Sequence, residues 1–349
     1  MFSSYRAEDV TILLKDITGC IDPLPTAERE RLIQSGHHYS EMLPLEYEPT
    51  EKYLEAYADA LARYAGITAQ ATARLAEQIY AEKGADAALV SLARAGTPIG
   101  ILLKHYIRQR FGADVAHYTI SIIRGRGIDA NAMDYILARH APAAVQFVDG
   151  WTGKGAIQRT LAEAAAPYAG LSAGLAVLSD PAYVAEKCGT HEDFLIASSC
   201  LNATVSGLLS RTVLRADLIG PADFHGAAFY EELRGKDLTY DFIDSVERLF
   251  PPAASPIEEA AAHTSGLAEV ERIAADFGIA DINLVKPGIG EATRVLLRRL
   301  PWKLLVHSTA DEERLGHLYQ LAEEKGVEVA AYPLRNYLAC GLIRTLADN

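Results

Sequence analysis

Short apolar runs alternate with helical patterns through the middle of the chain. Apolar and β-branched residues at 87–92, 117–123, 145–148, 173–178 and 194–197 predict buried strands, and the ranges 100–111, 130–139 and 156–166 predict helices between them. Strands that alternate with helices form a parallel, doubly wound sheet, and ligands bind at the carboxyl ends of its strands. We therefore expect an α/β domain over residues 81–250.

The region before this domain has a different pattern. Residues 1–80 are polar and predicted to be helical, as a hood over the α/β domain. An alanine-rich pattern over 54–80 predicts a helix with one buried face, which Gly66 could divide in two. The polar and aromatic loop at 34–44 is expected to cover a site, because its adjacent histidines are poorly placed to bind a single metal ion.

A proline-rich stretch after residue 250 marks a domain boundary. The run Pro251-Pro252-Ala253-Ala254-Ser255-Pro256 predicts a linker over residues 251–267. Beyond it, the patterns predict a second small α/β/α domain over residues 268–349. Its expected elements are a helix reaching residue 277, strands at 282–285, 303–306 and 327–331, helices ending at 299 and 325, and a final helix.

Composition and charge restrict the class of protein. The chain has 349 residues, of which 50% are hydrophobic, and a net charge of −13, so DNA is not an expected partner. Its four cysteines include no CxxC pair, which argues against a disulfide framework or a zinc ribbon. The N-terminus lacks the apolar region of a signal peptide, and no apolar run reaches membrane-spanning length. We expect a cytoplasmic protein that does not enter a membrane.

A glycine-rich turn follows the strand at 145–148. Asp149 stands at the end of the strand, and Gly150-Trp151-Thr152-Gly153-Lys154-Gly155 leads into the helix at 156–166. The backbone N–H groups of a glycine turn and of a helix start bind anions, while Thr152 can donate its hydroxyl and Asp149 can accept from sugar hydroxyls. The pattern predicts a phosphate or sugar-phosphate site, and an ordinary tight turn is the alternative interpretation.

Arginines stand in the turns after two other strands. Arg94 lies in Ser91-Leu92-Ala93-Arg94-Ala95-Gly96-Thr97-Pro98, and Arg124 and Arg126 lie in Arg124-Gly125-Arg126-Gly127. Because turns at the carboxyl ends of parallel strands meet at one edge of the sheet, we expect these cations to face the Asp149 turn and bind phosphate groups. Solvated surface charge is the alternative for Arg124 and Arg126.

In order and spacing, the three turns resemble those of the type I phosphoribosyltransferases. The resemblance spans residues 87–199 and implies a phosphoribosyltransferase-like fold that transfers ribose 5-phosphate from phosphoribosyl pyrophosphate (PRPP) to a nitrogen acceptor resembling a nucleobase. It also implies Mg²⁺, held through the ligand rather than by a protein metal site. The implied catalytic residues are Asp149, Arg94, Arg124 and Arg126, and the implied substrate-binding residues are Gly150, Trp151, Thr152, Gly153, Lys154, Gly155, Ala95, Gly96 and Thr97. Gly150 stands where the family usually has a second acid.

Two further stretches, residues 38–44 and 202–212, narrow the resemblance. They are similar to the phosphoribosyltransferase-like proteins of bacterial tellurite-resistance and stress clusters, a family also labelled cysteine protease StiP. That label implies an alternative activity, in which Cys200 or Cys188 supplies a thiol nucleophile and His191 an imidazole base. A non-catalytic PRPP or nucleotide sensor that couples ligand binding to RNA is a further alternative.

The C-terminal region resembles the Pelota-type RNA-binding domain. The run Lys286-Pro287-Gly288-Ile289-Gly290-Glu291-Ala292-Thr293-Arg294 predicts a glycine turn before a helix, and residues 337–341 resemble the closing helix of that domain. The resemblance covers residues 268–349 and implies that kinked RNA binds through Lys286, Gly288, Gly290, Glu291 and Arg294. A small docking domain is the alternative, because the region is near neutral overall.

Overall fold

A seven-stranded sheet forms the centre of the α/β part of the molecule. The computed structural model describes residues 2–257 and 265–343. Six of the strands run parallel, and the short β5 pairs antiparallel with β4, so the expected parallel sheet is confirmed. In spatial order the parallel strands are β1 (Thr11–Ile12), β4 (Ala116–Ile123), β3 (Ala88–Ala93), β6 (Val145–Trp151), β7 (Leu175–Ser179) and β8 (Lys187–Thr190), with β5 at Gly127–Ile128.

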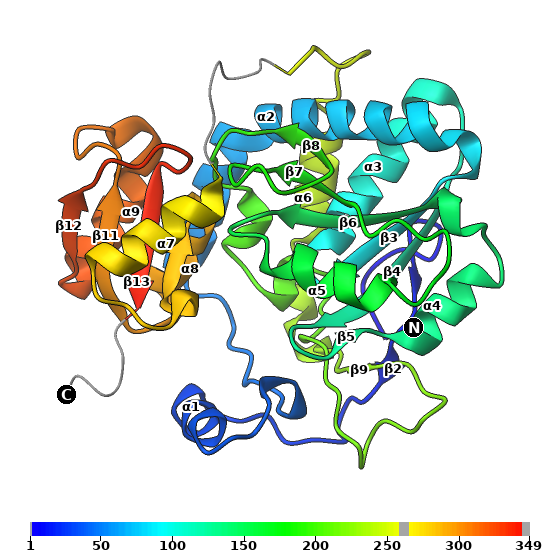
Figure 1. The fold of residues 1–349 in the computed structure, drawn as a ribbon, viewed down its shortest axis with the longest axis horizontal. Helices are drawn as coiled ribbons and strands as arrows, with labels where there is room; N and C mark the ends of the chain where they lie inside the picture. The colour runs from blue at the N-terminus through cyan, green and yellow to red at the C-terminus, as the bar shows by residue number, and fades with distance from the viewer. Residues whose placement is uncertain (1, 258–264, 344–349) are drawn as a thin grey trace.

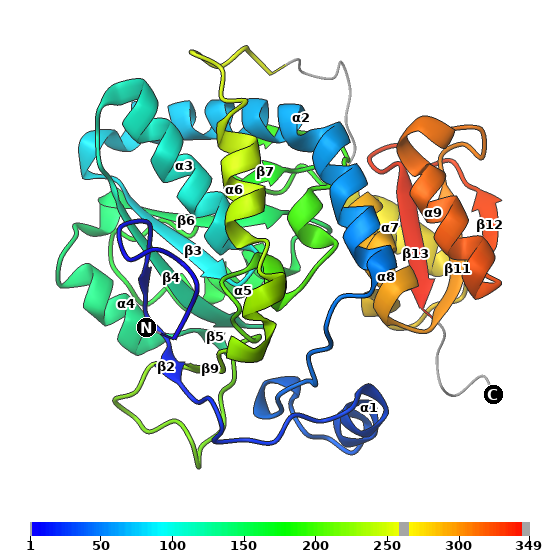
Figure 2. The same cartoon turned by 180° about the vertical axis from the view of Figure 1, so that it is seen from behind.

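Helices cover both faces of this sheet (Figures 1 and 2). On one face lie α2 (Glu51–Lys83), α3 (Gly96–Phe111) and α6 (Thr239–Glu247), and on the other lie α4 (Ala130–Leu137) and α5 (Ala156–Ala165). Each face has its own core, because the strand side chains point alternately to the two sides. Leu75 and Phe242 belong to the first core, and Met133 and Leu161 belong to the second.

The long helix α2 is continuous, so the expected break at Gly66 is not present. Gly66 lies on the exposed side of the helix, and a Cβ atom there would meet nothing within 4 Å. Its intrinsic cost of about 1 kcal/mol is small beside the burial of Leu75 and Ile79 on the opposite face. Although α2 is long, no helix in residues 2–257 or 265–343 combines the length and apolar character needed to cross a membrane.

Two sequence-based predictions in the α/β part need correction. The prediction that residues 1–80 are helical holds for α1 (Thr26–Gln34) and α2, but the stretch before α1 instead forms β1 and β2 (Lys15–Asp16), and β2 pairs with β9 (Gly226–Ala227). Two-residue strands are too short to show a period in the sequence. The strand expected at 194–197 is instead irregular core packing, and the edge strand is β8, whose Lys187-Cys188-Gly189-Thr190 is not an apolar run.

Short 3-10 helices connect several of these elements. They are η1 (Tyr39–Glu41), η2 (Gly84–Asp86), η3 (Pro142–Ala144), η4 (Ala197–Ser199), η5 (Ala203–Val205), η6 (Glu231–Lys236) and η7 (Ile282–Leu284).

The C-terminal unit is a four-stranded sheet between two layers of helices. Its strands run in the order β10 (Val285–Pro287), β13 (Ala339–Ile343), β11 (Pro301–Val306) and β12 (Glu328–Ala331). The helix α7 (Gly266–Asp276) belongs to one core, and α8 (Ile289–Arg298) and α9 (Glu312–Lys325) belong to the other. The expected linker at 251–267 and the start of the helix predicted up to residue 277 lie partly in residues 258–264, which are outside the described residues. Residues 344–349 are also outside them.

The expected closing helix at 337–341 is wrong, because this stretch leads into the central strand β13. All five residues of β13 are buried between strands β10 and β11. A short apolar run that is buried on both faces has no period that distinguishes a strand from a helix.

The first half of α2 also packs against the C-terminal unit (Figure 2). The hydroxyl of Tyr53 donates to the carbonyl oxygen of Leu297 at 2.6 Å, and Nη1 of Arg63 donates to that of Glu313 at 2.6 Å. Ala60 of α2 and Leu296 of α8 belong to one continuous hydrophobic core. The two units therefore share part of their buried surface.

Candidate functional site

The turns after β3 and β6 meet at one edge of the sheet, as the parallel topology predicts. A Cβ atom on Gly96 would lie 2.5 Å from the carbonyl oxygen of Val148, so only glycine permits this approach. At Gly150 the nearest atom to such a Cβ would be the carbonyl oxygen of Ala95, at 3.9 Å. The turns that contain Ala95–Gly96 and Asp149–Gly150 are thus in direct contact.

The polar groups of the glycine-rich turn bind other parts of the protein. The hydroxyl of Thr152 donates to the carboxylate of Asp180, and the carbonyl oxygen of Gly153 accepts from the hydroxyl of Tyr337 at 2.5 Å. Nζ of Lys154 donates to the carbonyl oxygens of Ile282 (2.5 Å) and Val285 (2.9 Å) in the C-terminal unit. Two donor groups that were expected to hold a sugar phosphate, the hydroxyl of Thr152 and the amine of Lys154, therefore donate to protein oxygens instead.

Gly155 ends this turn with a left-handed conformation, at φ 77°, and caps α5. Its neighbour across the turn is Val184, whose side chain would lie 3.5 Å from a Cβ atom on Gly155. The start of α5 is consequently covered by the loop between β7 and β8.

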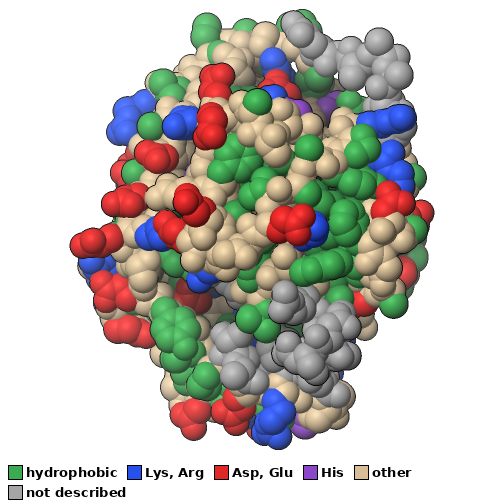
Figure 3. Space-filling model, turned by 90° about the vertical axis from the view of Figure 1, so that its left-hand side faces the viewer, with side chains coloured by type: hydrophobic (Ala, Val, Ile, Leu, Met, Phe, Trp, Pro, Cys, Tyr) green, Lys and Arg blue, Asp and Glu red, His purple; other side chains and the backbone are tan. Residues whose placement is uncertain are grey.

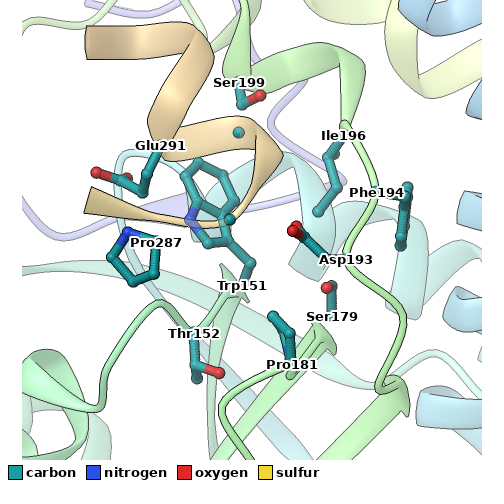
Figure 4. Close-up of a pocket in the computed structure, with 12 residues that line it drawn as sticks. Trp151, Thr152, Ser179, Pro181, Asp193, Phe194, Ile196, Ser199, Pro287 and Glu291 are labelled. Atoms are coloured by element: carbon teal, nitrogen blue, oxygen red, sulfur yellow. The ribbon is translucent and has the colours of Figure 1, made fainter. Parts of the chain in front are cut away.

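Asp149 and Trp151 lie beneath the start of α8. Oδ1 of Asp149 accepts from the backbone N–H of Gly150 at 2.8 Å, and burial raises the pKa of Asp149 to about 7. The guanidinium carbon of Arg294 lies 5.8 Å from the centre of the Trp151 ring. Figure 4 shows Trp151 inside a narrow hollow between the two units, which Asp193, Ser199 and Glu291 also line.

The arginines expected to bind phosphate have partners elsewhere in the chain. Arg94 donates to the carbonyl oxygen of Leu209 and to Oδ1 of Asn202, both at 3.0 Å. Arg126 forms an ion pair with Glu41.

Two other predicted site residues have different neighbours. The hydroxyl of Thr97 is buried and lies 2.8 Å from that of Thr119, beneath the turn. Arg124 reaches the C-terminal unit, where its Nη1 donates to Oδ1 of Asn283 at 3.2 Å.

A thiol and an imidazole lie together at the carboxyl end of β8. Sγ of Cys188 is 3.5 Å from Nε2 of His191, and Nδ1 of His191 is 2.7 Å from the carbonyl oxygen of Asp180. The His191 ring stacks on Tyr183, with 3.8 Å between ring centres and 9° between planes. A carbonyl oxygen can only accept, so Nδ1 carries hydrogen and, in the neutral ring, Nε2 can take a proton from Cys188.

The two buried candidate cysteines have different surroundings. Burial, followed by the nearby Asp180 carboxylate, raises the pKa of Cys188 to about 12, so its thiol is protonated near neutral pH. Cys200 is fully buried, and its Sγ lies 3.7 Å from the carbonyl oxygen of Ala56 in α2. Cys188 is the one for which the structure places a histidine nitrogen beside the sulfur.

The loop that supports His191 depends on a buried carboxylate. Oδ2 of Asp180 accepts from the backbone N–H groups of Val184 (2.9 Å) and Ala185 (2.8 Å), while Oδ1 accepts from Thr152. This residue and Tyr183 were not predicted from the sequence. The only available signal was the position of Asp180 directly after a buried strand.

The predicted RNA-contacting residues lie where the C-terminal unit faces the α/β part. Oδ1 of Asp193 accepts from the backbone N–H of Ile289 at 2.9 Å, and its Oδ2 accepts from that of Leu338 at 2.8 Å. Gly288, Gly290 and Glu291 line the hollow beside Trp151. A carboxylate of the α/β part therefore caps the start of α8.

The fold and the thiol pair define a class: an α/β protein with a candidate cysteine nucleophile and an attached small α/β/α unit. Residues 3–247 match the family described as "Tellurite-like stress resistance cysteine protease StiP". Residues 264–345 match the "PELOTA RNA binding domain". The chain is also 38% identical over 364 residues to "Cysteine protease StiP" of Acinetobacter baylyi (strain ATCC 33305 / BD413 / ADP1), covering 98% of this chain and 94% of that protein. The chain belongs to the StiP family.

These matches correct the main functional expectation. The transferase interpretation, with PRPP and a nucleobase-like acceptor as substrates, is wrong, because the matching family and relative are both described as cysteine proteases. The structure supplies a physical reason, since the hydroxyl of Thr152 and the amine of Lys154 donate to other protein groups. The tellurite-resistance and stress context agrees with the family description. The Mg²⁺ and the cytoplasmic location stay predictions.

Proposed function

We propose that the chain is a cysteine peptidase in which Cys188 is the nucleophile and His191 the general base. The supporting observation is the 3.5 Å approach of Nε2 of His191 to Sγ of Cys188, with Nδ1 bound to the Asp180 carbonyl oxygen. That second bond fixes both the ring orientation and the tautomer. It assigns to a backbone carbonyl the orienting role that a carboxylate or amide side chain often has in such sites.

The proposed reaction begins with proton transfer. Because burial keeps the Cys188 thiol protonated, its proton passes to Nε2 of His191 as the Sγ–C bond to the substrate carbonyl forms. The carbonyl electron pair moves to oxygen, then returns as the C–N bond breaks, and His191 gives the proton to the leaving amine. Water then attacks the thioester, with His191 taking its proton, and the acid product and free thiol are released.

The C-terminal unit is proposed to bind RNA. This part of the proposal is supported by the match of residues 264–345 to an RNA-binding domain and by the cations Lys286 and Arg294 beside Gly288, Gly290 and Glu291. The stretch 268–349 is taken as the RNA-binding domain and residues 81–250 as the peptidase domain, after a hood at 1–80. We also infer that the sheet shares its architecture, though not its activity, with the phosphoribosyltransferases, from the order of its strands and turns.

Cleavage of fluorescein-labelled casein by variants with one cysteine or histidine replaced tests the proposed peptidase activity. We expect Cys188→Ser and His191→Asn each to lower the rate at least about a hundredfold, because each removes a group of the thiol pair. Cys200→Ser and Cys20→Ser are the matched controls and should keep the activity of the unmodified chain. Loss of activity in Cys200→Ser with full activity in Cys188→Ser would instead assign the nucleophile to Cys200.

A further inference from the structure

Two arginines of the α/β part, Arg124 and Arg211, lie beside the ring of Tyr39. The guanidinium carbon of Arg211 lies 5.1 Å from the centre of the Tyr39 ring, and that of Arg124 lies 5.9 Å from it. The hydroxyl of Tyr39 accepts from the backbone N–H of Arg124 at 2.8 Å, which fixes the ring. Arg124 in turn bonds to Asn283 of the C-terminal unit. These contacts bring four separate chain segments together at the junction of the two units.

Lys286 and Arg294 extend this cluster on the C-terminal side. Burial lowers the pKa of Lys286; the nearby Glu291 carboxylate opposes this shift, and Arg124 and Arg294 are among the cations that add to it. Burial also lowers the pKa of Arg211 to about 10, and Arg294 is again among the nearby cations. Like charges that crowd together while partly desolvated are unfavourable, and an incoming anion would relieve that cost.

The acidic side chains of this chain neutralise only part of the cluster, since Glu291 pairs with Arg294 at 3.5 Å. Although the net charge is −13, none of Arg124, Arg211 and Lys286 lies within 4.0 Å of a carboxylate oxygen in the described residues. The outer face of the C-terminal unit shows a different arrangement, with acidic and basic side chains interspersed (Figure 3).

We propose that RNA held by the C-terminal unit continues across the junction onto the α/β part, where Arg124 and Arg211 bind its phosphates and Tyr39 stacks on a base. This inference rests on the RNA binding proposed above and extends it to residues outside the matched RNA-binding domain. Cations beside an aromatic ring are the combination that binds single-stranded RNA, since phosphates take the cations and a base takes the ring. An acidic peptide would use the cations but would have no need of the ring.

The full-length chain and two RNAs test this site. One probe is a fluorescein-labelled kinked hairpin, and the other is the same hairpin with a single-stranded extension of about ten nucleotides. We expect the extension to raise affinity, and Arg124→Gln and Arg211→Gln each to weaken binding of the extended RNA about three- to tenfold. Each substitution should also reduce the slope of log K against log salt by about 0.7, the value for one lost phosphate contact. Tyr39→Leu should weaken binding of the extended RNA about tenfold, because the stacking on a base is lost.

Arg139→Gln is the matched control, because Arg139 also lies over a tyrosine ring, at 3.5 Å from the centre of Tyr135. It should leave the affinity for both RNAs unchanged. Arg211→Lys keeps the charge at this partly buried position and should retain most of the affinity, which separates charge loss from misfolding.

Two outcomes are distinguishable from the expected one. Variants of Arg124, Arg211 and Tyr39 that bind the extended RNA as the unmodified chain does, while Arg294→Glu loses it, would overturn this inference and leave RNA binding by the C-terminal unit intact. An unmodified chain that binds neither probe would overturn both proposals.

Discussion

The thiol of Cys188 lies close enough to Nε2 of His191 for proton transfer, but the thiol is protonated near neutral pH. The carbonyl oxygen of Asp180 fixes which ring nitrogen carries hydrogen. Burial disfavours the thiolate, and the Asp180 carboxylate disfavours it further. The pair therefore does not rest as thiolate and imidazolium, and activation of the sulfur belongs to the reaction step itself.

This protonation state predicts slow alkylation of Cys188. Near neutral pH we expect iodoacetamide to modify the exposed Cys20 well before Cys188, because only a thiolate reacts and the pKa of Cys188 is raised to about 12. Between about pH 7 and pH 9 the rate at Cys188 should rise roughly tenfold per pH unit. Mass spectrometry of the two cysteine peptides measures both rates. Modification of Cys188 as fast as Cys20 at neutral pH would contradict the protonated resting state.

At the scale of elements, the sequence predicted the parallel strands β3, β4, β6 and β7 because each is an apolar run next to a helical pattern. It missed β8 and β13 for opposite reasons: β8 is held by pairing with β7 despite a mixed sequence, and β13 is apolar on both faces. The meeting of two glycine turns was predictable from topology. The family label implied a thiol and His191 as an alternative but left Cys188 and Cys200 both open, and the Asp180 loop that orients His191 depends on contacts distant in the sequence.

Alanine substitutions at two glycines, one where α2 packs against β8 and one on the exposed side of α2, test how tightly the helix packs on the strand. A Cβ atom on Gly189 would lie 2.3 Å from the carbonyl oxygen of Ala71, so Gly189→Ala should force the helix and the strand apart and lower the free energy of unfolding by about 1–3 kcal/mol. Gly66→Ala is the control on the same helix, where open space should allow a gain of about 0.5–1 kcal/mol. Urea unfolding of both variants provides the measurement. A neutral Gly189→Ala would show that α2 moves freely on β8.

At the scale of the whole molecule, the two units form one packed body with a shared carboxylate. The first half of α2 contacts α8, and Asp193 binds backbone N–H groups of Ile289 and Leu338. On the other side of the junction, Lys154 and Tyr337 connect the glycine-rich turn to the C-terminal unit. The segment that carries His191 and Asp193 is therefore in direct contact with the proposed RNA-binding unit.

The shared carboxylate predicts a pH-dependent stability. Burial raises the pKa of Asp193 to about 6, above its value in the unfolded chain, so its contribution to stability is fully present below the unfolded pKa and is lost as pH rises through 6. In Asp193→Asn this change is absent. The Tm of the unmodified chain should therefore fall relative to that of the variant as pH rises from about 4.5 to about 7.5. Parallel curves of Tm against pH for the two proteins would contradict this pH dependence.

The cap on α8 has one further consequence, which concerns competition. The amide of Ile289 can serve only one strong acceptor at a time, and Asp193 holds it in this structure. A phosphate group that takes the same amide must displace Asp193, which lies two residues from His191. By thermodynamic reciprocity, a second ligand whose binding depends on the position of Asp193 and this phosphate ligand would change each other's affinity by the same factor.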